Sequence, residues 1–142
     1  MTADTGLLLL NLRIVGLLMA GLVVLNLFVP RRFRWRDELS RISLLNRQIF
    51  EVHAIFLVLT LGLISALLLT SADALLEHTR LARALLIGLT LFWGLRMLVQ
   101  WFYYSPAVWR GHRFHTAMHY AFSAMWIYVT AVFGSALYFA AL

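Results

Sequence analysis

The residues best suited to chemistry in this chain are histidines beside long apolar stretches. His53 lies about one turn inside the second such stretch, and His115 and His119 enter the fourth. His115 and His119 are four residues apart, a helical spacing that lets two imidazoles share one metal ion. If His53 faced either of them from a neighbouring helix, two imidazoles could hold a haem b between them. The histidines therefore predict a haem b or a single metal ion as a candidate cofactor.

A second group of polar and aromatic residues recurs at helical spacing in the third stretch, with one member in the fourth. Pockets for small molecules combine apolar walls with a few convergent polar groups. The pattern predicts a site for an amphiphile such as a quinone or a lipid. Its head would meet Arg96, Gln100 and Tyr103, while Trp93 and Trp126 would contact its ring or tail. In a third interpretation, the same residue types only hydrogen-bond headgroups, water and backbone at a membrane boundary.

Composition limits the class of protein that positions these residues. Hydrophobic residues make up 63% of the 142 residues and charged residues 13%, against about 25% in soluble domains. Cysteine is absent, which excludes disulfides, thiolate metal sites and iron–sulfur clusters. The net charge of +6 is carried by arginine beside apolar stretches, so anionic lipid headgroups are the expected partner and nucleic acid is not.

Four apolar stretches are long enough to span a bilayer. A hydrocarbon core of about 30 Å needs roughly 20 apolar residues in a helix. Residues 7–29, 49–70, 81–104 and 117–142 meet this requirement, with loops at 30–48 and 105–116. Small residues recur four apart in each span, as at Gly16/Ala20 and Gly62/Ala66, which favours close helix packing. The sequence predicts one all-α domain over residues 1–142, a four-helix transmembrane bundle.

The distribution of arginine predicts the orientation of this bundle. Six arginines follow the first span and two follow the third, and positive loops stay in the cytoplasm. Both termini are therefore expected outside, in a multi-pass protein of the inner (plasma) membrane. Within residues 31–47, arginines alternate with apolar residues, which predicts either a short interfacial helix along the headgroups or a solvated basic loop.

The sequence leaves two classes of function open. It contains no glycine-rich phosphate loop, no serine–histidine–acid arrangement and no HExxH motif, so an enzyme acting on its own is not expected. One prediction is a small membrane subunit of unknown reaction that binds haem, a metal or a quinone- or lipid-like ligand at the cytoplasmic side. The alternative is a structural or accessory subunit of a larger membrane complex without chemistry of its own. Both imply association with other membrane subunits or with further copies of the chain.

Overall fold

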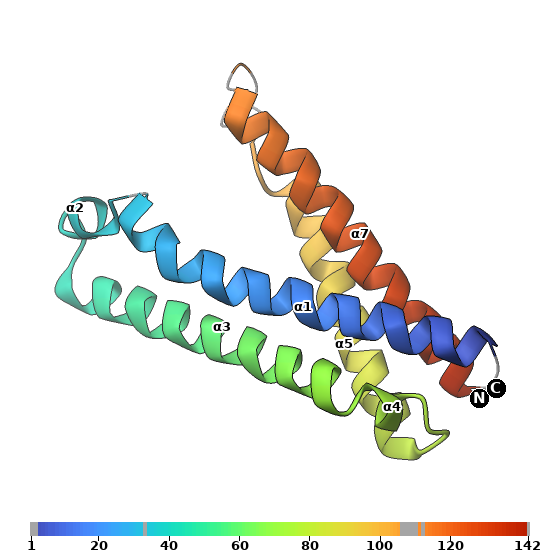
Figure 1. Cartoon of the computed structure of the whole chain (residues 1–142). Helices are drawn as coiled ribbons and strands as arrows, with labels where there is room; N and C mark the ends of the chain where they lie inside the picture. Colours follow the sequence, from blue (N-terminus) through green and yellow to red (C-terminus); the bar gives the residue numbers. More distant parts are fainter. Residues whose placement is uncertain (1–2, 33, 106–110, 112, 142) are drawn as a thin grey trace. The chain divides into compact units, whose positions relative to one another are not determined.

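The described part of the chain is all-helical. The computed structural model describes residues 3–32, 34–105, 111 and 113–141, and no strand occurs among them (Figure 1). Its elements in chain order are α1 (Ala3–Arg32), α2 (Trp35–Leu39), α3 (Leu44–Thr70), α4 (Ala72–Leu75), α5 (Arg80–Phe102) and α7 (Arg113–Ala141). The all-α class predicted from the sequence is confirmed.

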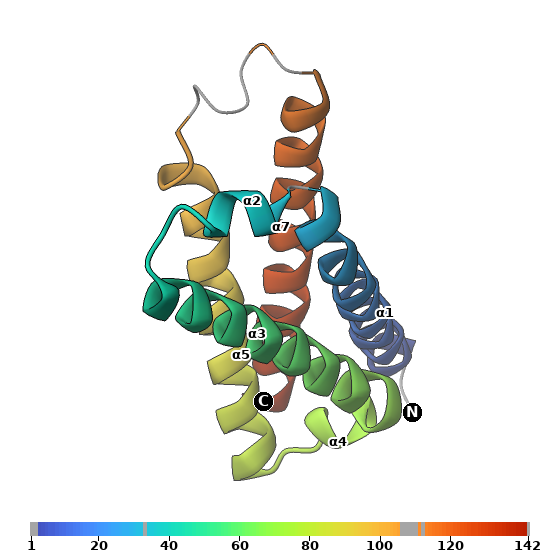
Figure 2. The same ribbon diagram turned by 90° about the vertical axis from the view of Figure 1, so that its left-hand side faces the viewer.

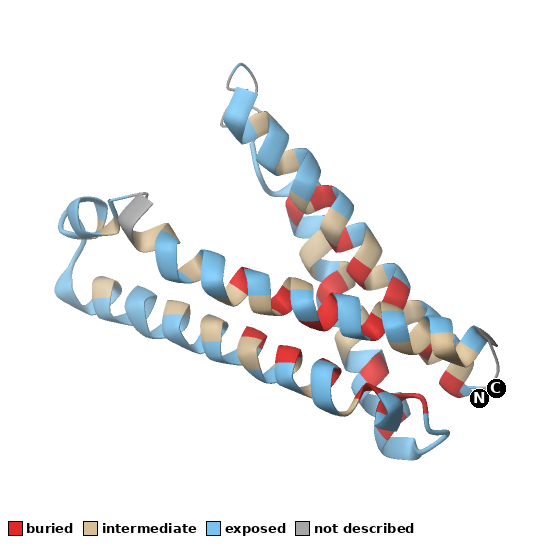
Figure 3. Ribbon diagram, in the orientation of Figure 1, coloured by how far each residue is buried: buried red, intermediate tan, exposed pale blue. Residues whose placement is uncertain are grey.

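Four of these helices, α1, α3, α5 and α7, are long and apolar enough to cross a membrane. In the apolar window of each, only 17 to 33% of the residues are buried within the protein. Most apolar side chains on these helices are therefore exposed on the protein surface (Figure 3). Soluble proteins rarely expose contiguous apolar surface on this scale, whereas lipid is a suitable surrounding for it.

The helix ends differ from the predicted spans for local reasons. Helix α3 begins at Leu44 because the Ser43 hydroxyl accepts the Asn46 N–H at 3.3 Å, so residues predicted as loop form its first turn. At α5, the Thr79 hydroxyl accepts the Ala82 N–H at 3.1 Å. Helix α5 ends at Phe102, two residues before the predicted end of its span. Helix α7 begins at Arg113, so His115 lies in a helix rather than in the predicted loop.

Contacts divide the chain into two compact units, and each is described by itself. The first unit comprises residues 1–12 and 72–142, and the second comprises residues 13–71. The single transmembrane domain remains a prediction from the sequence.

In the second unit, α1 and α3 run antiparallel and pack through a glycine (Figure 1). The Ser65 hydroxyl donates to the Gly16 carbonyl at 2.9 Å. A Cβ atom built on Gly16 would lie 3.0 Å from the Leu69 side chain, so only glycine fits this approach without a shift. The helices approach less closely at Gly62, where an added Cβ atom would lie 4.0 Å from the Val23 side chain. The small residues expected to allow close packing do so most clearly at Gly16.

In the first unit, α5 and α7 lie side by side and antiparallel in both views (Figures 1 and 2). Near the middle of the pair, a Cβ atom on Gly94 would lie 3.8 Å from Thr130. The start of α1 joins this unit, because Tyr128 donates its hydroxyl hydrogen to Asn11 Oδ1 at 2.7 Å. The first unit therefore contains contacts of α7 with both α5 and the start of α1.

Candidate functional site

A chain of hydrogen bonds connects the polar side chains of α5 and α7. Arg96 donates to Gln100 Oε1 at 3.2 Å, because residues four apart lie on one face of α5. Gln100 Nε2 lies 3.1 Å from His119 Nδ1 on α7. An amide nitrogen only donates, so Nδ1 accepts and a neutral His119 carries its hydrogen on Nε2. We call these three residues, with the rings of Trp93 and Trp126 beside them, the α5–α7 cluster.

The guanidinium of Arg96 lies among neutral groups. Its Cζ atom is 5.0 Å from the centroid of the Trp126 ring and 5.8 Å from that of Tyr104, which gives two cation–π contacts. Helices α5 and α7 contain no aspartate or glutamate. The partners that the described structure gives this half-buried cation are therefore an amide oxygen and aromatic faces.

Two stacked indoles form the buried aromatic part of the cluster. The Trp93 and Trp126 rings lie 4.9 Å apart with an interplanar angle of 16°, and both residues are at least 96% buried. Phe122 stacks on the other side of Trp126 at 6.0 Å. Within the described residues, the Nε1 atoms of both tryptophans and the hydroxyl of Thr130 are buried without a hydrogen-bond partner. A buried polar group left without a partner costs about 1–3 kcal/mol.

The predicted pocket residues do not all join this cluster. Trp93, Arg96, Gln100, His119 and Trp126 come together as described. Tyr103 follows the end of α5, is 80% exposed, and its ring lies edge-on to Tyr104 at 6.0 Å. Tyr103 is the C-cap of α5, and its N–H still donates to the Val99 carbonyl, so the residue lies at the very end of the helix.

The remaining predicted histidines are placed elsewhere. His115 is exposed one turn before His119, with its ring 5.9 Å from that of Phe114. His112 lies outside the described residues. His53 is exposed on α3 in the second unit, and its Nδ1 lies 2.7 Å from the Ile49 carbonyl oxygen, to which it donates. A haem held by His53 and a histidine of α7 would join residues of both units and stays a prediction.

The described residues contain no group of three or more histidine, cysteine, aspartate or glutamate side chains arranged to hold a metal ion. The hydrogen bond from Gln100 occupies Nδ1 of His119. A metal ion held by His115 and His119 at their helical spacing, or shared with His53, stays a prediction.

Sequence reasoning missed one half-buried polar contact of the first unit. Asn11 donates its amide hydrogen to the Leu7 carbonyl at 2.8 Å, and its oxygen accepts from Tyr128. Asparagine inside an apolar stretch signals that a partner is needed. Nothing in the sequence distinguishes Tyr128 from the other aromatic residues of α7 as that partner.

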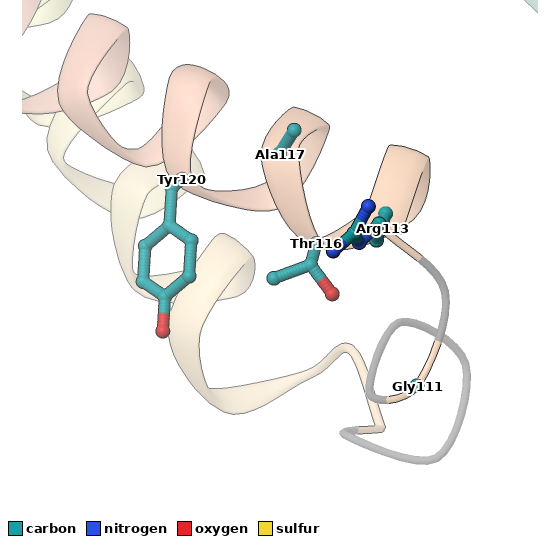
Figure 4. Close-up of a pocket in the computed structure, with 5 residues that line it drawn as sticks. All are labelled: Gly111, Arg113, Thr116, Ala117 and Tyr120. Atoms are coloured by element: carbon teal, nitrogen blue, oxygen red, sulfur yellow. The ribbon is translucent and has the colours of Figure 1, made fainter.

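A shallow cavity of about 380 Å³ lies at the beginning of α7, apart from the cluster (Figure 4). Its lining consists of Gly111, Arg113, Thr116, Ala117 and Tyr120. The lining contains no residue predicted to bind a ligand.

Comparisons with protein-family models, with curated proteins and with solved structures give no match for this chain. The geometry of its own residues therefore carries the functional argument.

Proposed function

We propose that the chain is a four-span membrane protein whose α5–α7 cluster binds the polar head of an amphiphile. In this proposal the four long helices form a transmembrane bundle in the inner (plasma) membrane, with both termini outside. The apolar helices and the arginines after the first and third of them support this orientation. The cluster then lies toward the cytoplasmic side, within reach of a ligand that enters from the lipid.

Arg96 is the observation that carries this proposal. It lies six residues before the end of α5, about 9 Å along the helix axis, so it is placed inside the apolar part of its span. A cation in hydrocarbon is costly and usually marks a ligand or ion site when it faces protein rather than lipid. Since its own helix and α7 supply no carboxylate, a ligand with a negative or strongly accepting head would complete its surroundings.

The other polar groups of the cluster define the class of ligand. The indole N–H groups of Trp93 and Trp126 are donors, and the hydroxyl of Thr130, one turn beyond Trp126 on α7 and outside the cluster as defined, is also able to donate. A donor-rich site without carboxylates favours a head made of acceptors, such as quinone carbonyls or a lipid phosphate. The half-buried ring of Phe122, which stacks on Trp126, offers a flat apolar surface for a ring or an acyl chain.

The experiment compares ligand binding by Arg96→Ala and wild-type protein purified in a mild detergent. Native mass spectrometry measures the bound quinone or phospholipid after both have been added to the micelles in equal amounts. We expect Arg96→Ala to lose most of the retained ligand. Arg83→Ala is the matched control, because Arg83 is an exposed arginine at the other end of the same helix. Equal retention by wild type and Arg96→Ala would refute the proposal.

A second candidate, a structural or accessory subunit, is favoured by one specific observation. Arg96, Gln100 and His119 already hydrogen-bond to one another, so they are able to hold α5 against α7 without a ligand. This function predicts that Gln100→Leu lowers the melting temperature of the protein while no ligand is retained by either form. Retention by the wild type of a stoichiometric ligand that Arg96→Ala loses would exclude it.

A further inference from the structure

A second cavity, whose lining includes charged residues, lies in the second unit, at the end of α1 and in the first half of α3. It has a volume of about 840 Å³ and includes residues from α1, α2 and α3. Helix α2 is held against α3 by an edge-on contact between Trp35 and Phe50, whose ring centroids are 4.8 Å apart. The cavity therefore has one wall from a helix of five residues that is anchored by an aromatic pair.

The charged residues of this cavity carry both signs. Arg34 and Arg36 supply guanidinium groups, and Asp37 and Glu51 supply carboxylates. Arg34 has a φ of 47°, in the left-handed region that residues other than glycine seldom adopt. Arg34 is the N-cap of α2 and lines the cavity in this conformation.

The cavity becomes apolar toward the middle of α3. Glu51 is followed one turn later by Ala54 and Ile55, which also line it, about 6 Å further along the helix axis. Trp35 and Leu39 contribute apolar surface from α2. The lining thus changes from charged to apolar in the direction that leads into the proposed span.

We infer that this cavity binds a phospholipid whose headgroup carries a primary amine next to its phosphate. The guanidinium groups of Arg34 and Arg36 bind the phosphate, because arginine forms charge-assisted hydrogen bonds to phosphate oxygens. The carboxylates of Asp37 and Glu51 accept the three N–H bonds of the ammonium group. The glycerol and the first carbons of the acyl chains lie along Ala54 and Ile55.

Because the cavity carries both positive and negative side chains, it distinguishes this phospholipid from lipids with other headgroups. A headgroup with a phosphate and no cation would place its charge beside two carboxylates without compensation. A choline headgroup has the cation but no N–H to donate. Ethanolamine is the simplest headgroup that satisfies both pairs of residues.

The test uses the full chain in detergent micelles that contain equal amounts of phosphatidylethanolamine, phosphatidylcholine and phosphatidylglycerol with identical acyl chains. Native mass spectrometry counts each lipid retained per protein. We expect roughly fivefold more phosphatidylethanolamine than either competitor, a modest ratio because exposed ion pairs are weak. Equal retention of the three lipids, or a preference of the wild type for phosphatidylglycerol, would overturn the inference.

Variants assign the preference to this cavity. The double variant Asp37→Asn, Glu51→Gln should lose the preference for phosphatidylethanolamine and gain phosphatidylglycerol. Arg34→Gly removes a guanidinium while glycine accepts the left-handed backbone, and it should lower retention of all three lipids. Glu38→Gln and Arg41→Gln are matched controls, because these residues neighbour the cavity in sequence without lining it. An unchanged preference in the double variant would show that the lipid binds elsewhere and would refute binding at this cavity. If the double variant does not fold, the lipid preference of the wild-type protein decides whether the inference holds.

This inference rests on the membrane location in the proposed function but not on the α5–α7 cluster. Arg96→Ala tests that cluster and should leave the phosphatidylethanolamine preference unchanged. Loss of one binding activity without the other therefore shows which of the two proposals fails.

Discussion

Gln100 and His119 join two helices through a hydrogen bond of 3.1 Å between the amide nitrogen and Nδ1. Gln100 is 94% buried, and its amide oxygen is held by Arg96 at 3.2 Å, so both ends of the amide are used. An amide that bridges a cation and an imidazole in this way fixes the rotation of α5 relative to α7. The orientation of the Arg96 side chain consequently depends on His119.

The bridge predicts coupling between Gln100 and His119. We expect Gln100→Leu and His119→Ala to destabilise the protein by less in combination than the sum of their separate effects, with a coupling of about 1 kcal/mol. Thermal unfolding in detergent of the two single variants and the double variant measures this value. Gln48→Leu, at an exposed glutamine of α3, is the control and should be additive with His119→Ala. Additive effects of Gln100→Leu and His119→Ala would contradict the bridge.

The close approach of α1 and α3 predicts different effects at two glycines of one helix. Gly16→Ala places a methyl group 3.0 Å from Leu69 and 3.1 Å from Leu68, so we expect a loss of about 1–3 kcal/mol in stability. Gly21→Ala meets nothing within 4 Å and should be neutral or stabilising by up to about 1 kcal/mol, since alanine favours helix over glycine. Melting temperatures in detergent measure both. The same shift at the two positions would show that α1 and α3 do not pack through Gly16.

The contact of Tyr128 with Asn11 predicts a stability effect of a single hydroxyl group. Tyr128→Phe removes the hydroxyl that donates to the side-chain oxygen Oδ1 of Asn11 at 2.7 Å. We expect the free energy of unfolding to fall by about 1 kcal/mol. Tyr138→Phe is the control, because Tyr138 is 70% exposed on the same helix. If the two variants melt at the same temperature, the start of α1 is not held to α7 by this bond.

The four helices were predictable from the sequence because an apolar run of bilayer length leaves few other structures. The pattern also predicted that Trp93, Arg96 and Gln100 share a face, since spacings of three and four follow from the helix itself. Tyr103 was expected on that face, but α5 ends one residue before it. Helix ends depend on local capping, which hydrophobicity alone does not specify.

Pairings between helices were not predictable in the same way. The bond from Gln100 to His119 depends on the rotation and register of α5 and α7, which a single sequence does not encode in its periodicity. His53 illustrates the opposite case, because its Nδ1 is satisfied by the Ile49 carbonyl of its own helix. A histidine in a span therefore does not by itself require a partner from another helix.

The proposed orientation predicts where fused reporters are active. A reporter joined to the C-terminus, or inserted between Glu77 and Thr79, should be active only outside the cytoplasm. A reporter inserted at Arg41 should be active only inside, because the arginines around it resist translocation. Activity of the C-terminal fusion in the cytoplasm would contradict the proposed placement of both termini.

The most direct measurement of the central proposal is the identity of whatever the wild-type protein retains from its membrane. Solvent extraction of the purified protein, with mass spectrometry of the extract and an absorption spectrum of the intact sample, answers this question. Besides the phosphatidylethanolamine expected at the cavity between α1, α2 and α3, we expect one amphiphile with a quinone or phosphate head, near one molecule per chain, that is strongly depleted in Arg96→Ala. A Soret band with split bands on reduction would assign haem instead, and an extract that matches bulk lipid and is unchanged in Arg96→Ala would contradict a ligand site at the α5–α7 cluster.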